Sequence, residues 1–489
     1  MKRVLEGLEP QKVFYFFEEI SKIPRGSFNE KAVSDWIVNF ARERGLSVTQ
    51  DESWNVVINR PASPGYENKK KIILQGHMDM VCEKLPEMKH DFTKDGIELV
   101  VDGEFLRADG TTLGADDGNA LALCLALLDD KELQAPALQV IFTTAEESGF
   151  KGVLALDGAL IDGDYLIGLD YSQDDKILVS CAGDVHGSAF LPVSKEKTEN
   201  SEEKCCLEIS LSGLRSGHSG IEIIKGRCNA NKLMGGILAK LNEEFQVDLA
   251  AAEGGTRSNV IPAEAKMTVC FKKEDEAAVR DVLTELSESM KVCYGKTDPE
   301  LKLSVCEKTV PELCYRASDK ENLIRLLDIV PNGLQTYLDV EHTITESSSN
   351  LGIVKEKEGG TEFVFLIRSN SNYQRDELNR KMETVCRLCG AEYRVEGCVN
   401  AWEYNPDSSL IPKVAEIFEQ VKGFRPDIHI FHAGVETGEL IEKAKKNGKK
   451  LEAVNLGVKN YDVHTPKERM EIASIGKTYE LLKAILREM

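Results

Sequence analysis

Apolar residues in the first 190 positions follow two patterns, one typical of helices and one of buried strands. Residues 1–45 have the helical period, with a break at residues 24–26 and a closing Gly45 that is suited to a C-cap. Apolar runs with little alternation then lie at residues 72–74, 137–142 and 165–169. Such runs are typical of strands in a sheet that is covered on both faces, so the pattern predicts an α/β domain.

The middle of the chain has a different pattern. The segments "CCLEISLSGLRSGHSG" and "NVIPAEAKMTVCF" alternate apolar and polar residues, as antiparallel strands with one exposed face do, and flank a helical stretch at residues 229–245. A later strand ("TEFVFLIRSNSN") and helix predict a second α+β unit of the same kind. The α/β pattern returns near residue 400. We therefore predict a catalytic domain in two parts, 1–186 and 401–489, interrupted by a lid at 187–400 with two similar α+β halves.

Polar residues that can bind metal follow the ends of the buried strands. They are His77 and Asp79 in "KIILQGHMDMV", Asp116 and Asp117 at the start of an apolar helix, Glu146 and Glu147 in "TAEESG", and Asp170 in "GLDYS". The carboxyl edge of an open α/β sheet is where ligands bind. Adjacent acids repel each other unless a cation or a proton relieves them. Taken together, these residues favour a metal site.

Each of these features also has a simpler interpretation when it is taken alone. His77 and Asp79 fit a helix cap or a surface turn about as well as a metal site. Each acidic pair fits a solvated loop, or a helix N-terminus whose dipole stabilises negative charge. The recurrence of such residues on successive strand ends is what favours metal.

Catalytic zinc binds histidine nitrogens and carboxylate oxygens, and a pair of zinc ions needs a bridging carboxylate with further ligands on each side. The candidate ligands are His77, Asp116, Glu147, Asp170 and His464.

Composition narrows the class of protein. The chain has 489 residues, which predicts two or more domains, and its 42% hydrophobic and 29% charged residues are typical of a globular protein. The net charge of −21 would repel nucleic acid and anionic membrane surfaces. The charged N-terminus and the lack of an 18-residue apolar run predict a cytoplasmic protein with no membrane partner. We expect the 13 cysteines to be reduced thiols, buried as small hydrophobic residues.

These motifs resemble a known family. "GHMDMV", "LGADDG", "TAEESG" and "GLDYS", followed by "SGHSG" and "VHTP", are similar to the co-catalytic zinc exopeptidases and deacylases. Over essentially the whole chain the sequence resembles the bacterial aminoacyl-histidine dipeptidases, also called cytosolic nonspecific dipeptidases, in stretches such as "HDFTKD", "GTTLGAD", "NANKL" and "HAG". The resemblance implies a zinc-exopeptidase-like, three-layer catalytic domain with a mixed sheet, interrupted by an α+β lid domain.

The resemblance also implies how two zinc ions, or other divalent metals such as Mn or Co, would be bound. His77 and Asp170 would hold one metal, Glu147 and His464 would hold the other, and Asp116 would bridge both.

Three neighbouring acids have roles beside these ligands in the family. Asp79 would orient the ring of His77 and raise its basicity. Glu146 would be the general base that takes a proton from the attacking water and delivers it to the leaving amine. Asp117 stands where some relatives have Asn, and it would either assist Asp116 or compete with it.

Substrate-binding residues are implied in the lid and the returning domain. His218 in "SGHSG" would stabilise the oxyanion of the tetrahedral intermediate. Asn259 and Arg368 would bind the C-terminal carboxylate of the substrate, and Gly434 would let backbone amides approach it. Without the resemblance, His218 also fits a hydrogen-bonded loop histidine, and Arg368 is better interpreted as a surface charge on an edge strand.

The predicted function is a dinuclear zinc dipeptidase that hydrolyses short peptides, including Xaa-His dipeptides. An N-acyl amino-acid deacylase or aminoacylase is the alternative, because the same metals hydrolyse its amide bond and the fold does not fix the substrate. A peptide-binding protein without activity is a third possibility, but it would be expected to lack one of the metal-site residues, and none is missing. We also predict a homodimer formed through the lid.

Overall fold

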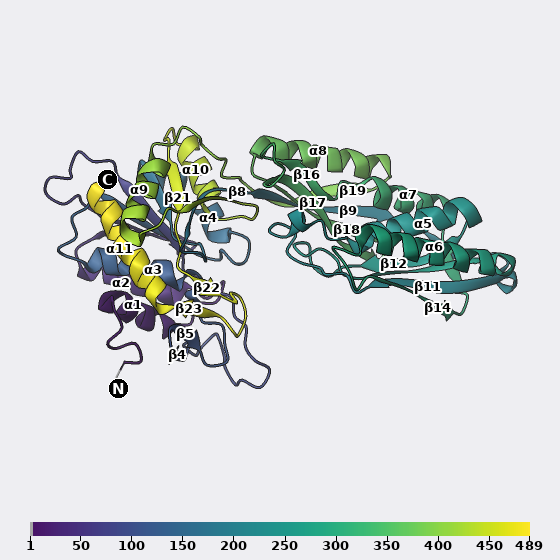
Figure 1. Cartoon of the computed structure of the whole chain (residues 1–489), viewed down its shortest axis with the longest axis horizontal. Helices are drawn as coiled ribbons and strands as arrows, with labels where there is room; N and C mark the ends of the chain where they lie inside the picture. Colours follow the sequence, from purple (N-terminus) through teal and green to yellow (C-terminus); the bar gives the residue numbers. More distant parts are fainter. Residues whose placement is uncertain (1–2) are drawn as a thin grey trace. The chain divides into compact units, whose positions relative to one another are not determined.

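The computed structural model describes residues 3–489, which form two compact units. The first unit holds the chain up to Ser180, together with Tyr404–Ile430 and Val435–Met489, and the second holds Cys181–Glu403 and Phe431–Gly434 (Figure 1). The sequence placed the changes of domain at residues 186 and 400, whereas the compact units change at Ser180 and Glu403. The difference arises because strand β9 (Gly183–Pro192) pairs along its length within the second unit.

A mixed eight-stranded sheet forms the centre of the first unit. Its order is β1 (Ser47–Gln50), β2 (Val56–Arg60), β6 (Leu138–Thr143), β3 (Ile72–His77), β7 (Tyr165–Gly168), β21 (Glu452–Asn455), β8 (Lys176–Cys181) and β20 (Asp427–Phe431). Strands β6, β3, β7 and β21 are mutually parallel, whereas β1 pairs antiparallel with β2, β2 with β6, and β8 with β21. Every residue of β3, β6 and β7 is buried, so both faces of the sheet are covered, as the apolar runs predicted.

Helices and a small sheet complete the first unit. The helices are α1 (Gln11–Ser21), α2 (Lys31–Glu43), α3 (Ala115–Asp129), α4 (Lys151–Ala155), the 3₁₀ turn η1 (Gly158–Leu160), α9 (Leu410–Lys422), α10 (Thr437–Lys446) and α11 (Ile472–Glu488). The small sheet has the order β22 (Asn460–Tyr461), β23 (Arg469–Glu471), β5 (Phe105–Ala108) and β4 (Leu99–Asp102). Helix α3 is apolar and almost wholly buried, and it packs against α1, α11 and β3. Its first turn therefore lies close to the end of β3.

The second unit contains a nine-stranded antiparallel sheet. Its order is β14 (Lys302–Lys308), β11 (Lys204–Ser212), β13 (Ala265–Lys272), β12 (Asp248–Gly254), β17 (Thr345–Lys357), β18 (Gly360–Ser369), β9 and β19 (Glu392–Val399), with β16 (Gly333–Tyr337) also pairing β17. The two predicted α+β halves share this one sheet, because Gly254 of β12 pairs with Val354 of β17.

Four helices accompany this sheet, and apolar side chains from them and from the sheet form a second core. They are α5 (Ala230–Phe245), α6 (Glu276–Tyr294), α7 (Ala317–Ile329) and α8 (Asn372–Leu388), with a two-stranded sheet of β10 (Lys195–Lys197) and β15 (Leu313–Tyr315) and the 3₁₀ turns η2 (Ser201–Glu203), η3 (Ile223–Lys225) and η4 (Lys273–Asp275). The helical stretch predicted at residues 229–245 is α5, whose N-cap is Asn229.

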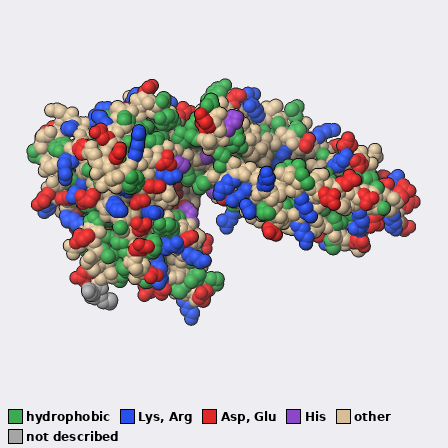
Figure 2. Space-filling model, viewed as in Figure 1, with side chains coloured by type: hydrophobic (Ala, Val, Ile, Leu, Met, Phe, Trp, Pro, Cys, Tyr) green, Lys and Arg blue, Asp and Glu red, His purple; other side chains and the backbone are tan. Residues whose placement is uncertain are grey.

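The distribution of charge and the burial of the cysteines agree only partly with what the composition predicted. On the face shown in Figure 2, basic side chains lie among acidic ones on both units, so the net charge of −21 is not gathered into one acidic patch there. No disulfide joins any of the 13 cysteines, which all lie in the described part of the chain, but Cys293, Cys306 and Cys398 are exposed rather than buried as expected. No helix of residues 3–489 is long and apolar enough to cross a membrane.

Candidate active site

His77 is the last residue of β3, and its buried ring lies between two carboxylates. Its Nδ1 is 3.3 Å from Oδ1 of Asp79, and its Nε2 is 3.1 Å from Oδ1 of Asp116. The ring of His77 is 1% exposed and Asp79 is fully buried. The ring at the end of β3 therefore directs Nε2 to Asp116 and places Nδ1 beside Asp79.

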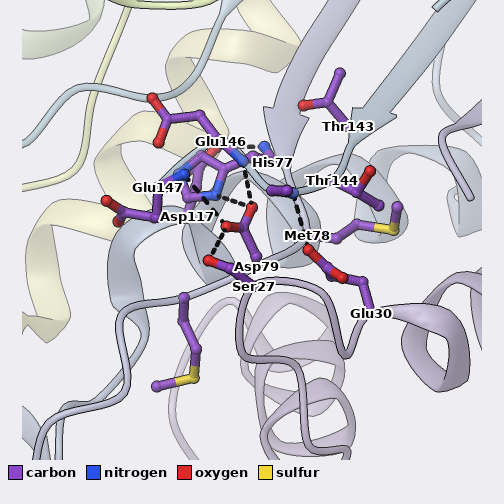
Figure 3. Close-up of polar contacts among 12 residues, drawn as sticks. Ser27, Glu30, His77, Met78, Asp79, Asp117, Thr143, Thr144, Glu146 and Glu147 are labelled. Atoms are coloured by element: carbon purple, nitrogen blue, oxygen red, sulfur yellow. Dashed lines mark hydrogen bonds and ion pairs between the residues drawn. The ribbon is translucent and has the colours of Figure 1, made fainter. Parts of the chain in front are cut away.

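Asp79 also holds the loop that follows β6. Its Oδ1 accepts a hydrogen bond from the backbone N–H of Glu146 at 3.0 Å, and its Oδ2 accepts one from that of Glu147 at 3.2 Å. The hydroxyl of Ser27 donates to Oδ2 at 2.7 Å. Figure 3 shows Asp79 at the centre of these contacts, with the carboxylates of Glu146 and Glu147 pointing away from it. One buried carboxylate thus orients both a histidine ring and an acidic loop.

The carboxylate of Asp116 lies between two imidazoles. While Oδ1 faces His77, Oδ2 is 3.3 Å from Nε2 of His464, and the same Nε2 is 2.7 Å from Oε1 of Glu147. One ligand atom from each of His77, Asp116 and Glu147 lies within 4.8 Å of the others. These three residues come from a strand end, a helix start and a loop, and they could hold a metal ion.

Two further acids, Asp170 and Glu146, are half-buried and interact with the charges of this group. Burial and the charge of Asp116 raise the pKa of Asp170 to about 7. Burial and the charges of Asp170 and Glu147 raise the pKa of Glu146 well above its usual range. Because carboxylate oxygens and imidazole nitrogens are the atoms that zinc binds, and bound cations would relieve this repulsion, the residues fit divalent metals.

Asp117 contacts backbone groups rather than the imidazoles. Its Oδ2 accepts from the N–H of His77 at 3.2 Å, and its Oδ1 accepts from the N–H of Ala120 at 3.3 Å within α3. Its side chain therefore supports the strand end and the helix start behind the group formed by His77, Asp116 and Glu147.

Glu436 is a buried acid that was not among the predicted site residues. Its Oε2 accepts hydrogen bonds from Nε2 of Gln75 at 2.7 Å and from Oγ1 of Thr143 at 2.5 Å, near the ends of β3 and β6. Burial raises its pKa to about 8. Nothing in its sequence context, "HAGVETG", signals this contact with two distant strands.

In the second unit, the ring of His218 is fixed by backbone amides. Its Nδ1 accepts hydrogen bonds from the N–H groups of Gly220 and Ile221, both at 3.1 Å. Burial and the charge of Arg368 lower the pKa of His218 to about 4, so the ring is neutral at pH 7. A neutral imidazole whose Nδ1 accepts must carry its proton on Nε2. His218 therefore presents a hydrogen-bond donor.

Other predicted binding residues also lie in the second unit. Arg368 is 6% exposed on β18, an interior strand, and its Nη1 lies 3.6 Å from Oδ2 of Asp184. The interpretation of Arg368 as a surface charge on an edge strand is therefore wrong, because β18 pairs with β17 on one side and with β9 on the other. Asn259 is exposed and its carbonyl accepts from the N–H of Ser219, next to His218. Gly434 ends the short segment Phe431–Gly434.

Comparisons with known proteins agree with this geometry. The chain belongs to the peptidase family M20/M25/M40, whose model matches residues 73–488. It is 33% identical over 485 residues to the cytosol non-specific dipeptidase of Escherichia coli (strain K12), covering 99% of each chain.

Two solved structures extend the comparison. The aminoacylhistidine dipeptidase from Vibrio alginolyticus superposes with a TM-score of 0.90 and 32% identity, over 99% of this chain and 98% of that one. The aminopeptidase PepT from Bacillus cereus superposes with a TM-score of 0.54 and 17% identity, over 98% and 99% of the two chains, which shows a shared fold alone.

Proposed function

We propose that the chain is a dipeptidase of this family that uses two zinc ions. The observation that supports it most directly is the carboxylate of Asp116 between the imidazoles of His77 and His464. On this proposal Asp116 would bridge the metals, His77 and Asp170 would hold one, and Glu147 and His464 would hold the other. Manganese or cobalt could replace zinc, since both accept the same donor atoms.

The bound metals would polarise the peptide carbonyl and lower the pKa of the attacking water. Glu146 takes the proton of that water and passes it to the leaving amine. Its carboxylate is free to do so, because Asp79 binds the Glu146 backbone and leaves its side chain pointing away. Asp79 also fixes the ring of His77 and so raises its basicity.

Residues of the second unit are proposed to bind the substrate. His218 donates from Nε2–H to the developing oxyanion, which the acceptor role of its Nδ1 supports. Arg368 and Asn259 bind the C-terminal carboxylate, and Gly434 lets backbone amides approach the peptide. We also propose that residues 187–400 act as a lid and pair two chains into a homodimer, which a monomer mass in light scattering would contradict.

The substrates proposed are short peptides, including Xaa-His, and the place of action is the cytosol. Both follow the similarity to proteins named cytosol non-specific dipeptidase and aminoacylhistidine dipeptidase. The same similarity favours a peptidase over an N-acyl amino-acid deacylase. The fold alone would not, because it does not fix the substrate.

The deciding experiment measures the release of free amino acids from dipeptides and from N-acetyl amino acids, with and without a chelator and added zinc. Chelator-sensitive cleavage of dipeptides, restored by zinc, supports the proposal and ranks Xaa-His among the substrates. Release from the acetylated compounds alone would keep the metal site and refute the substrate. No release from either set by the zinc-loaded protein would refute the activity.

A further inference from the structure

Four consecutive backbone N–H groups before and within the first turn of α3 converge on one buried carboxylate. Oε2 of Glu468 accepts from Leu113 at 2.8 Å and from Gly114 at 3.1 Å, and Oε1 accepts from Ala115 at 2.9 Å and from Asp116 at 3.4 Å. Such groups have no intrahelical partner at a helix start, and negative charge is favoured there. Glu468 is 2% exposed, so water does not compete for these bonds.

A buried guanidinium binds the same loop from its carbonyl side. Nη1 of Arg25 donates to the carbonyls of Met78 at 3.0 Å and Asp79 at 3.1 Å, and Nη2 donates to that of Gly114 at 2.5 Å. Gly114 has a φ of 68°, and a Cβ there would lie 2.6 Å from Nη2. The loop therefore passes so close to Arg25 that no side chain fits between them.

These two charges join three segments that carry proposed metal ligands. Glu468 follows His464 by four residues and binds the loop that ends at Asp116, and Arg25 binds that loop to the segment after His77. Burial lowers the pKa of Arg25, and the charge of Glu468 is the strongest of those that oppose this shift. Neither side chain bonds a carboxylate oxygen or ring nitrogen of a proposed ligand in the described contacts.

We propose that Arg25 and Glu468 are positioning residues of the metal site, which set the spacing of His77, Asp116 and His464 before any metal binds. The inference rests on the proposed function. Burying two charges has a desolvation cost. The two side chains give partners to buried backbone N–H and C=O groups, and each of these groups lies in or beside a segment that carries a proposed ligand.

A matched control separates positioning from general stability. Glu452 is also a carboxylate that accepts backbone hydrogen bonds across segments, from Ser409 at 2.7 Å and Leu410 at 3.1 Å. It begins β21 opposite Tyr165, at the edge of the sheet away from His77. Glu452→Gln therefore removes a similar set of bonds at a distance from the metal site.

The experiment measures zinc affinity by competition with a chromophoric chelator for wild type, Glu468→Gln, Arg25→Lys and Glu452→Gln. Urea unfolding of each metal-free protein gives its stability. Glu468→Gln and Arg25→Lys should bind zinc about 10- to 100-fold more weakly, the usual effect of losing a group that supports a ligand. Glu452→Gln should lose stability while its zinc affinity stays within about twofold of wild type.

Hydrogen exchange of the metal-free wild type tests the same idea without any variant. In peptic fragments that cover residues 113–116, the amide hydrogens should exchange slowly with solvent, since Glu468 binds these N–H groups before metal binds. Fast exchange there, or zinc affinity within about twofold of wild type in the folded variants, would overturn the proposal. If neither variant folds, the exchange result decides. If wild type itself binds no zinc, the proposed function fails, whatever the exchange of these amides shows about the two charges.

Discussion

His432 should make the second unit sensitive to acid. Its imidazole is buried, with Nδ1 2.8 Å from Oδ1 of Asn370 and Nε2 2.8 Å from Oγ of Ser348. A neutral ring satisfies both contacts, one as donor and one as acceptor. Burial and the charge of Arg368 lower the pKa of His432 from 6.5 to about 3.

The size of the effect follows from this pKa. The unfolded chain takes up a proton at His432 as the pH falls below about 6.5, whereas the folded chain resists it down to about 3. The free energy of unfolding therefore falls as the pH drops through this window. Each pH unit is worth about 1.4 kcal/mol, so His432 should lower the stability by about 2 kcal/mol between pH 7 and pH 5.

The assay compares wild type with His432→Gln by urea unfolding at pH 7 and pH 5. Trp402 reports on the second unit, once Trp36→Phe and Trp54→Phe have removed the two tryptophans of the first unit. Gln does not titrate, so its variant should lose about 2 kcal/mol less than wild type over this interval. Equal losses in the two proteins, to within about 0.5 kcal/mol, would refute the reasoning.

Four further predictions concern other residues and the metal. Phe28 is 65% exposed with a φ of 67°, so Phe28→Gly should raise the free energy of unfolding by about 0.5–1 kcal/mol. Lys232 donates to the carbonyls of Leu327 and Val330 at the end of α7, so Lys232→Met should lower it by about 2 kcal/mol. Urea unfolding checks both, and a Phe28→Gly protein less stable than wild type, or an unchanged Lys232→Met protein, would contradict them. Glu146→Gln should lower kcat about 100-fold or more in dipeptide turnover while elemental analysis finds the zinc content unchanged, and a parallel loss of zinc would instead make Glu146 a ligand. Zinc at 100 times its Kd should raise the free energy of unfolding by about 2.7 kcal/mol, and no rise would argue against binding to the folded state.

The sequence could predict that His77 and the Glu146–Glu147 loop lie at one edge of the sheet, because their signals are local. His464 lies in a loop between β22 and β23, so no buried strand end marks its place. An apolar run fixes where a strand ends, and parallel strands bring their carboxyl ends to one edge of a sheet. The start of α3 at Ala115 and the end of α2, whose C-cap Arg44 precedes Gly45, were also predictable from local residue patterns.

Contacts between distant segments were not predictable in this way. Glu468 binds residues more than 350 positions earlier in the chain. Arg25 lies in the short break between α1 and α2, where the sequence predicts only a turn. The burial of Arg368 depends on the pairing of β18 with β9, a strand about 180 residues earlier in the chain, which no local pattern signals. The domain boundaries shifted for the same reason, since β9 pairs inside the second unit.

Asp79 gives the site a mechanical property. Because one carboxylate binds both the ring of His77 and the backbone of Glu146, a displacement of the strand end carries the proposed proton carrier along with it. The separation of the two groups therefore depends on the contacts of a single side chain. A substitution of Asp79 should therefore weaken metal binding and proton transfer together. Substitutions of residues that do not contact Asp79 can change which peptides are preferred without this double effect.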